Sequence, residues 1–361
     1  MRVALPSIVV VLALAAVAVA AAVSSVLLPA GVSFGGIESV RGGLLVSGYE
    51  ATGHDCKWLV VDPVSLRVRS SLRANCSRPP IAAKPVVPIE FPIKGTNSDN
   101  LRIAHLSRDG GRPALGPVVM TYSSVSNTHL EWTYGPHTLW VYDVATRGGP
   151  EVLDVSSATG KVVRAVRMPA LSEPLLAADA DGLWIAASPE TGAGTPAPIY
   201  RLAPTATAPS IVHRGGYATL WLVAAGHTVW ADIGTLPHRG SASTPVRQEI
   251  WRFDGTATTG HALASATGLN AYPNSPVLQP GAHALWTISL VPDQGDYRLC
   301  LHAQLVRIDA NTGRQTVTRT LSIVDQSCLP VQGQAFVHGS FYFLSPYIND
   351  TLRTTLYRLQ P

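Results

Sequence analysis

The stretch Asp179–Ser188, DADGLWIAAS, joins a tight turn to a short apolar strand that carries a tryptophan. Asp and Gly favour turns, because an Asp side chain can bond to the nearby backbone and Gly accepts positive φ. A short apolar run with aromatic and β-branched residues is typical of a strand. Relatives of this stretch recur along the chain, so it predicts one unit of a repeating architecture.

The copies share a turn, an apolar strand and an aromatic residue near its start. They lie at Gly135–Asp143, Ala225–Ile233 and Gly281–Ser289, with looser copies at Arg41–Tyr49 and His338–Pro346. The equivalent aromatic or apolar positions are Leu45, Trp140, Trp184, Trp230, Trp286 and Tyr342. After Trp140 these positions are spaced by 44, 46, 56 and 56 residues, whereas the first gap of 95 residues has room for two repeats. We therefore expect a degenerate copy near residues 85–134.

Each unit has a second signature downstream, an apolar strand that runs into a turn. Examples lie at Lys57–Val68, Glu151–Val163, Ile199–Val212, Ile250–Gly260 and Leu305–Val317. Four antiparallel strands in roughly 45–50 residues are the dimension of a β-propeller blade. The sequence thus predicts an all-β fold, a single β-propeller over residues 29–361, most simply with seven four-stranded blades, although six to eight fit. Separate β-sandwiches are the alternative, and the steady period argues against them.

The last unit ends after its third strand. We expect its outer strand to come from the other end of the chain, around Val26–Ser33, so that the ring closes without an open sheet edge.

The composition favours ordered structure and argues against a nucleic-acid partner. Of the 361 residues, 46% are hydrophobic and 14% are charged, below the ~25% charged residues of typical soluble domains. The net charge is +4, and the basic residues form no run or arginine-rich helix.

The N-terminal residues 1–28 predict an export segment. Ile8–Val23 is unbroken apolar sequence after Met1-Arg2, which predicts an apolar helix. It fits a signal peptide, with Ala18–Ala20 or Ala20–Ala22 as the cleavage motif, or a membrane anchor. A buried core helix is a third, weaker interpretation. Export in either form places residues from about Val32 onward outside the cytoplasm, secreted or anchored by one helix, which is then the only membrane contact.

The units resemble the NHL, YVTN and streptogramin lyase-like propeller repeats, most clearly at Asp181–Pro204 and Leu305–Gly313. The resemblance covers nearly all of the chain after the leader and implies the scaffold. It also implies that a His/Glu pair with a metal could act here as it does in streptogramin lyases, but no His-x-Glu arrangement is present to carry that site over.

Four cysteines in an exported chain predict two disulfides. Cys56 and Cys300 precede or open the third strand of their blades, and Cys76 and Cys328 lie in the connections that leave those blades. Both kinds of loop emerge on the same face of a propeller. The repeat therefore predicts the pairs Cys56–Cys76 and Cys300–Cys328 over a metal or redox site, because no CxxC spacing is present.

Three histidines share one repeat position, three residues before the tryptophan: His137, His227 and His283. A metal site is one interpretation, but equivalent turns are spread around the ring, too far apart for Zn–N bonds of ~2.0–2.1 Å. We expect turn chemistry instead, with positive φ at these residues. Asp179 and Asp181 begin like a calcium loop but lack its distal ligands, so they too predict a turn. No cofactor is predicted.

The variable loops around the central channel are the predicted binding face, because rigid sheets hold such loops in place. The candidate binding residues there are Arg214, Tyr217, Tyr272 and Asn274. No standard hydrolase, protease or nucleotide-binding motif is present, so no catalytic residue is predicted. The leading hypothesis is a monomeric, non-catalytic module that binds a protein or glycan at the cell surface. The alternative is a lyase-type enzyme with its site on the same loops.

Overall fold

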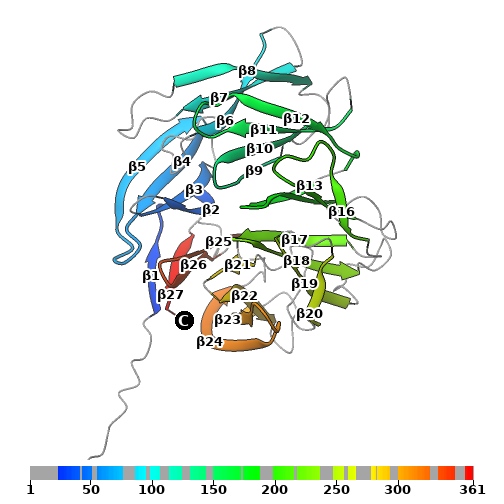
Figure 1. Ribbon diagram of the computed structural model, residues 1–361. Helices are drawn as coiled ribbons and strands as arrows, with labels where there is room; N and C mark the ends of the chain where they lie inside the picture. The colour runs from blue at the N-terminus through cyan, green and yellow to red at the C-terminus, as the bar shows by residue number, and fades with distance from the viewer. Residues whose placement is uncertain are drawn as a thin grey trace, which may run out of the picture.

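The computed structural model contains seven β-sheets arranged as the blades of a ring (Figure 1). It describes residues 23–40, 43–50, 55–75, 86–94, 98–105, 114–123, 131–143, 149–171, 174–187, 198–214, 218–235, 247–255, 259–265, 278–281, 283–292, 300–325, 332–345 and 354–360. In these ranges every regular element is a strand. The prediction of an all-β, seven-bladed propeller is confirmed.

Blades I to IV follow the chain in order. Blade I consists of β2 (Val32–Val40), β3 (Gly43–Glu50), β4 (Asp55–Val61) and β5 (Val68–Asn75). Blade II consists of β6 (Val86–Pro92), β7 (Ser98–His105) and β8 (Ala114–Ser123). Blade III consists of β9 (Glu131–Tyr134), β10 (Thr138–Asp143), β11 (Glu151–Ser156) and β12 (Val162–Arg167). Blade IV consists of β13 (Pro174–Asp179), β14 (Gly182–Ala187), β15 (Ile199–Leu202) and β16 (Ser210–His213).

Blades V to VII complete the ring. Blade V consists of β17 (Ala218–Ala225), β18 (Thr228–Thr235), β19 (Arg247–Asp254) and β20 (His261–Ser265). Blade VI consists of β21 (Gln279–Pro280), β22 (Ala284–Pro292), β23 (Cys300–Asp309) and β24 (Gln315–Asp325). Blade VII consists of β25 (Gln332–Val337), β26 (Ser340–Leu344), β27 (Thr355–Leu359) and β1 (Val23–Leu27). All pairings are antiparallel, and first strands of neighbouring blades contact one another, for example β2 with β25 and β13 with β17.

The degenerate copy expected near residues 85–134 is blade II. Its described residues form three strands, where four were predicted. The period that identified the other blades is lost here because the third residue of the second strand is the polar Asn100, where the other blades have an aromatic residue or leucine.

The two ends of the chain close the ring within blade VII. Strand β1 pairs with β27 from Val23 opposite Leu359 to Leu27 opposite Thr355. The expected closure is therefore present, but its position around Val26–Ser33 is wrong. Val32 already opens the inner strand of blade I, so the closing strand ends before the turn at Gly31, which has φ +78°. The closing strand also lies inside the segment 1–28 assigned to the leader.

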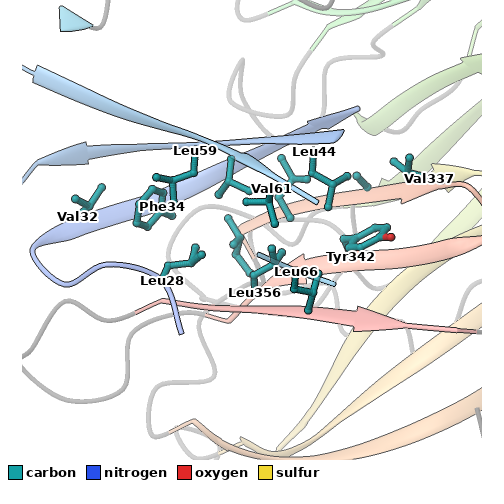
Figure 2. Close-up of a cluster of buried hydrophobic side chains, with 14 residues drawn as sticks. Leu28, Val32, Phe34, Leu44, Leu59, Val61, Leu66, Val337, Tyr342 and Leu356 are labelled. Carbon is teal, nitrogen blue, oxygen red and sulfur yellow. The ribbon is translucent and has the colours of Figure 1, made fainter. Parts of the chain in front are cut away.

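A cluster of apolar side chains packs blade VII against blade I (Figure 2). Leu28 and Leu356 come from opposite ends of the chain and lie in one cluster with Leu66 (Figure 2). Burial of apolar surface on this scale is the main stabilising term in folding. The closure of the ring near the chain ends is thus stabilised by core packing between blades VII and I as well as by strand pairing.

A pair of facing residues recurs at one place in every blade, and we call it the bridge position. It is the third residue of the second strand together with the residue opposite it on the third strand. The pairs are Leu45–Val60, Asn100–Thr121, Trp140–Asp154, Trp184–Arg201, Trp230–Arg252, Trp286–Arg307 and Tyr342–Arg358. Four of the seven are therefore an aromatic residue facing an arginine.

At several seams these residues reach the turn between the third and fourth strands of the next blade. From blade V, Trp230 Nε1 donates to Ala310 O of blade VI at 3.3 Å, and Arg252 donates to the same oxygen. From blade VII, Tyr342 Oη donates to Pro63 O of blade I at 2.7 Å, and Arg358 donates to Val64 O. We call these contacts inter-blade bridges.

Blade III makes the same bridge with a different arginine. Asp154 stands at the bridge position and accepts a hydrogen bond from Arg164 on the outer strand. Arg164 then donates to Ala203 O and Ala206 O in the turn of blade IV. Its guanidinium carbon lies 5.4 Å from the centre of the Trp140 ring, where a cation–π contact is favourable.

The turns that hold the three repeat histidines differ from their prediction. Positive φ was expected at His137, His227 and His283, but none of the three has it. It falls on Gly226 in blade V and Gly182 in blade IV, and on His338 with Gly339 in blade VII. Where a glycine stands in the turn, it takes the left-handed conformation at lower cost than a histidine would.

The predicted disulfides are only partly covered by the structure. Cys56 and Cys300 lie in the third strands of blades I and VI as expected, opposite Ala74 and Asp325. Their side chains, and Cys76 and Cys328 as a whole, lie outside the described residues. The two pairings therefore stay predictions.

Residues 1–22, which include most of the predicted export segment, also lie outside the described residues. Among the described residues there is no helix with the length and hydropathy of a membrane span.

Candidate functional site

The candidate site lies at the end of the blades that we call the loop face. There the second strand of each blade ends, the third begins, and the fourth leads on to the next blade; the opposite end is the turn face. Of the four predicted binding residues, Arg214 directly follows β16 on the loop face and is exposed. Tyr217, Tyr272 and Asn274 lie outside the described residues.

His213, the residue before Arg214, packs against the neighbouring blade. It is the last residue of β16 in blade IV, and its ring centre lies 4.3 Å from that of Trp251 in β19 of blade V, with a tilt of 57°. Both side chains are partly buried. The seam between blades IV and V is therefore lined by two aromatic rings, one of them on the residue that precedes Arg214.

Glu249 supplies a carboxylate to the same place. Residues two apart on a strand share a face, so Glu249 and Trp251 point the same way. The Trp251 indole Nε1–H donates to Glu249 Oε2 at 3.0 Å. This bond holds the Trp251 ring and the Glu249 carboxylate in a fixed relation, with Glu249 only 9% exposed.

Two opposing effects set the charge of His213. Burial lowers the pKa of the imidazole, and the Glu249 carboxylate raises it; burial is the larger effect, so the pKa lies below its ordinary value of 6.5. At neutral pH the ring is therefore uncharged and can accept a proton. The Nε2 atom is buried and has no hydrogen-bond partner among the described residues.

Thr219 adds a buried hydroxyl near the loop face. It lies on the inner strand of blade V opposite Ile233, and Ile233 lies opposite Glu249, so all three share one face of the sheet. The Thr219 side chain is fully buried, and within the described residues its Oγ1 has no hydrogen-bond partner. A buried hydroxyl without a partner is uncommon, because it costs free energy.

An apolar floor supports these polar groups from the turn-face side. Phe253 follows Trp251 on the same face of β19, and its ring centre lies 5.4 Å from that of Trp184 in blade IV. Both Phe253 and Trp184 are fully buried. The polar groups thus stand on a rigid, well-packed seam, which suits a binding site.

The adjoining connection from blade III to blade IV is also fixed on the loop face. Tyr142, at the loop-face end of β10, donates from its hydroxyl to Pro169 O at 2.9 Å and accepts from Leu171 N at 3.0 Å. Burial raises the pKa of this tyrosine, so the hydroxyl keeps its proton. This residue therefore holds the connection from blade III to blade IV in place.

His213, Glu249, Trp251 and Thr219 were missed by sequence reasoning. The spacing of Glu249 and Trp251 does place them on one face of a strand, which the sequence could have shown. Their meeting with His213 could not be read, because it depends on packing between the outer strand of one blade and the third strand of the next.

Metal binding has little support in the described part of the chain. It contains no group of three or more His, Cys, Asp or Glu side chains arranged to hold a metal ion. His137, His227 and His283 lie in turns of three different blades on the turn face, away from His213. The cluster on the loop face can stack against a ligand, donate from Arg214 and accept through Glu249.

Comparisons with known proteins support the fold alone. No family model and no curated protein matches the sequence. Among solved structures, the β-propeller domain of the Trilobed protease from Pyrococcus furiosus aligns with a TM-score of 0.57 and 8% identity, over 91% of this chain and 95% of that one. The polysaccharide lyase Uly1 aligns with a TM-score of 0.52 and 8% identity, over 90% and 89%. Hydrazine synthase from Kuenenia stuttgartiensis gives 0.51 and 10%, over 91% and 96%.

These similarities are enough to establish the β-propeller, while the finer resemblance to NHL, YVTN and streptogramin lyase-like repeats stays a hypothesis. The Pyrococcus furiosus domain has an open velcro topology. The present chain differs, because β1 pairs with β27 inside blade VII.

Proposed function

We propose that this protein is an extracytoplasmic binding module, secreted or anchored at the cell surface, whose loop face holds a protein or carbohydrate ligand. The observation that carries the proposal is the cluster of His213, Trp251 and Glu249 on the loop face, where exposed Arg214 follows His213 in the chain. Ligand sites combine aromatic surface with a few fixed polar groups, and this cluster has both on a rigid seam.

Export is supported by the sequence of the leader and by the four cysteines. The structure is compatible with processing at either alanine motif, because Ala20 and Ala22 both precede the closing strand at Val23. Intact mass of the exported protein tests this part. A chain that keeps its leader and stays in the cytoplasm, or four free thiols, contradicts it.

The binding test uses a glycan array and a set of purified surface proteins, followed by affinity measurements with the variant Arg214→Ala. Loss of one charged contact at a binding site should weaken a ligand by about tenfold or more. The matched control is Arg67→Ala, an exposed arginine in the turn between β4 and β5 on the opposite face. An equal loss in both variants, or no loss at Arg214, contradicts the proposed site.

A lyase-type enzyme is the second candidate, favoured by His213 and Glu249. An uncharged imidazole beside a carboxylate is a common pair for proton transfer. One protein of similar fold is a polysaccharide lyase, although its similarity to this chain extends to the fold alone. Incubation with uronate-containing polysaccharides, monitored for unsaturated products, tests this reading. Turnover by the wild type that His213→Gln abolishes would favour the enzyme over the binding module.

A further inference from the structure

The chain enters the propeller on the turn face. The closing strand β1 runs from Val23, opposite Leu359, to Leu27, opposite Thr355. Strand β27 begins at Thr355 on the loop face and ends at Leu359 on the turn face, so the antiparallel strand β1 starts at the turn-face end. The apolar sequence Ile8–Val23 therefore leads directly into the turn face at blade VII.

An anchor in this position would bring the propeller to the lipid surface. If helical, as the sequence predicts, Ile8–Val23 spans about 24 Å, which is less than the ~30 Å thickness of the hydrocarbon core. A span shorter than this core is accommodated by thinning of the bilayer, so its flanking residues lie close to the lipid. The apolar run ends at the first residue of β1, so the turn face directly adjoins such an anchor.

Three blades share one form of turn between their third and fourth strands. The turns are Asp62–Arg67 in blade I, Ser156–Lys161 in blade III and Asp309–Arg314 in blade VI. In each turn the backbone N–H of the first residue donates to the carbonyl of the last, at 2.9, 2.9 and 3.0 Å. The last residue is a cation in all three turns, and it is exposed on the turn face.

The carboxylates in two of these turns bond inside the turn. Asp62 Oδ1 accepts from two backbone N–H groups of its own turn, at 2.9 and 2.7 Å. Asp309 Oδ1 does the same in blade VI, at 3.1 and 2.8 Å. The cations at the other end of each turn are exposed, and exposed cations attract anionic lipid headgroups.

Exposed valines lie beside the same cations. Val64, in the turn of blade I, is 69% exposed. Four more lie within the first three residues of a fourth strand and are 39% to 65% exposed: Val68, Val162, Val163 and Val317. A strand rises about 3.4 Å per residue, so each of these four lies within about 7 Å of its turn. Blades I, III and VI are spread around the ring, so the valines form three separate contact points on one face (Figure 1).

The turn of blade I holds its exposed valine rigidly. Leu66 has φ +57°, at the position where the turns of blades III and VI have glycine. This conformation is unfavourable for leucine, but the Leu66 side chain is buried in the cluster between blades VII and I. Arg358 of blade VII also donates to Val64 O at 3.0 Å. A rigid turn loses little conformational entropy when its side chain enters another surface.

We propose that the turn face docks flat on a lipid surface in the anchored form of this protein. The exposed valines of blades I, III and VI enter the headgroup region, and Arg67, Lys161 and Arg314 pair with lipid phosphates. The proposal rests on the anchored form of the proposed function, and it directs the loop face away from the membrane, toward a ligand. It adds a second membrane contact to the N-terminal segment, which was expected to be the only one.

Lipid quenching on the full chain in vesicles measures the docking directly. A fluorophore is attached to Val64→Cys, Val317→Cys or Leu27→Cys, in vesicles that contain phosphatidylglycerol and a lipid with a nitroxide on its acyl chain. Leu27 is the matched control, because it is 53% exposed and lies at the loop-face end of β1. Labelled wild type gives the background from the native cysteines. Quenching at the two valine positions should exceed that at Leu27 by at least about threefold.

Three outcomes of this experiment would overturn the proposal. The first is equal quenching at all three positions, or stronger quenching at Leu27. The second is quenching at Val64 without quenching at Val317, because it would show contact at one blade instead of flat docking. The third is shielding of the Val64 label in lipid-free detergent together with a doubled mass, because it would show that a second copy of the chain covers this face.

The cations supply a second test. The triple variant Arg67→Gln, Lys161→Gln and Arg314→Gln should lower the quenching at Val64→Cys by at least about twofold in phosphatidylglycerol vesicles, to the level seen in phosphatidylcholine vesicles. The control is Arg167→Gln, because Arg167 is exposed at the loop-face end of β12. No loss in the triple variant, or the same loss in the control, contradicts the proposal. Circular dichroism confirms that the variants are folded.

Docking and ligand binding can be separated by experiment. The triple variant should keep the ligand affinity of the wild type, because its substitutions lie on the turn face. Removal of the leader from the exported chain, seen by intact mass, would overturn the docking and leave a secreted binding module. Strong quenching at Val64 in a protein that binds no ligand would support the docking and contradict the binding module.

Discussion

Asp181 and His227 occupy the same position of two successive repeats, and their side chains meet: His227 Nδ1 lies 2.8 Å from Asp181 Oδ2. One is the turn residue of blade IV and the other the turn residue of blade V. The backbone joins them as well, because Ala180 N donates to Gly226 O at 3.1 Å. Between blades IV and V, the repeat position that His137 and His283 also occupy thus forms a contact between neighbouring turns.

The Asp181–His227 pair should contribute little to stability. The His227 side chain is 74% exposed, and exposed ion pairs are worth below about 1 kcal/mol. We expect His227→Ala, Asp181→Asn and the double variant to give a coupling free energy below about 1 kcal/mol in a thermodynamic cycle. Urea unfolding measures this coupling free energy. A larger value would show that the contact makes a major contribution to the stability of the interface between blades IV and V.

Gly182→Ala should be far more harmful than Gly226→Ala. A Cβ on Gly182 would lie 2.2 Å from the backbone oxygen of Leu202, and the residue has φ +131°. Gly226 has φ +65° and no atom within 4 Å of its Cβ position, so its variant should lose only about 1 kcal/mol. Thermal unfolding of the two variants checks this. Similar melting temperatures would contradict the close approach in blade IV.

Arg252→Met should destabilise the ring by about 1–3 kcal/mol, because it removes charge-assisted bonds to the turn of blade VI and leaves Ala310 O with fewer donors. Arg69→Met, at the exposed start of β5 in blade I, should change the free energy of unfolding much less. Urea denaturation compares the two. If both variants lose the same free energy, the bridge has no special role in stability.

Truncation should separate the leader from the closing strand. A chain that begins at Val23 keeps every pair between β1 and β27, so it should fold and melt close to the full chain. A chain that begins at Pro29 loses β1 and Leu28, which exposes the edge of β27 and part of the core between blades VII and I. It should unfold at a markedly lower temperature and aggregate. A stable, monomeric short chain would contradict the closure.

His213 should make stability depend on pH in a definite direction. Its pKa in the folded protein lies below the ordinary value of 6.5, mainly through burial. Below pH 6.5 the unfolded chain therefore binds more protons at this residue, so the free energy of unfolding falls as the pH is lowered. The slope fades as the pH rises past 6.5, because the unfolded chain then loses its proton at this residue as well. His213→Gln should flatten the dependence below pH 6.5, measured by urea unfolding at several pH values, and an unchanged slope would refute it.

The fold could be predicted from the sequence because most blades repeat the same local sequence features. A few neighbouring residues specify the turn at Asp181-Gly182, the strand that follows it and the packing residue Trp184. Because this pattern recurs in other blades, it is easier to recognise than a single copy would be. The recurring arginine at Arg201, Arg252, Arg307 and Arg358 was equally visible, but its partner was not. The hydrogen bonds of Arg252 and Arg358 run to a turn of the next blade, 58 residues away for Arg252 and Ala310, whereas Arg201 donates to Asp181 O in its own blade.

Sequence alone thus determined the strand period and the need for a closing strand, and it favoured seven blades within a range of six to eight. Tertiary structure decided which strand closes the ring, where the seams are bridged and which side chains meet on the loop face. Arg214 could be proposed from its place in a connection, whereas His213, Trp251 and Glu249 come together only because two sheets pack face to face. Local conformation depends on neighbours along the chain, but a site between blades depends on the packing of residues that the sequence keeps far apart.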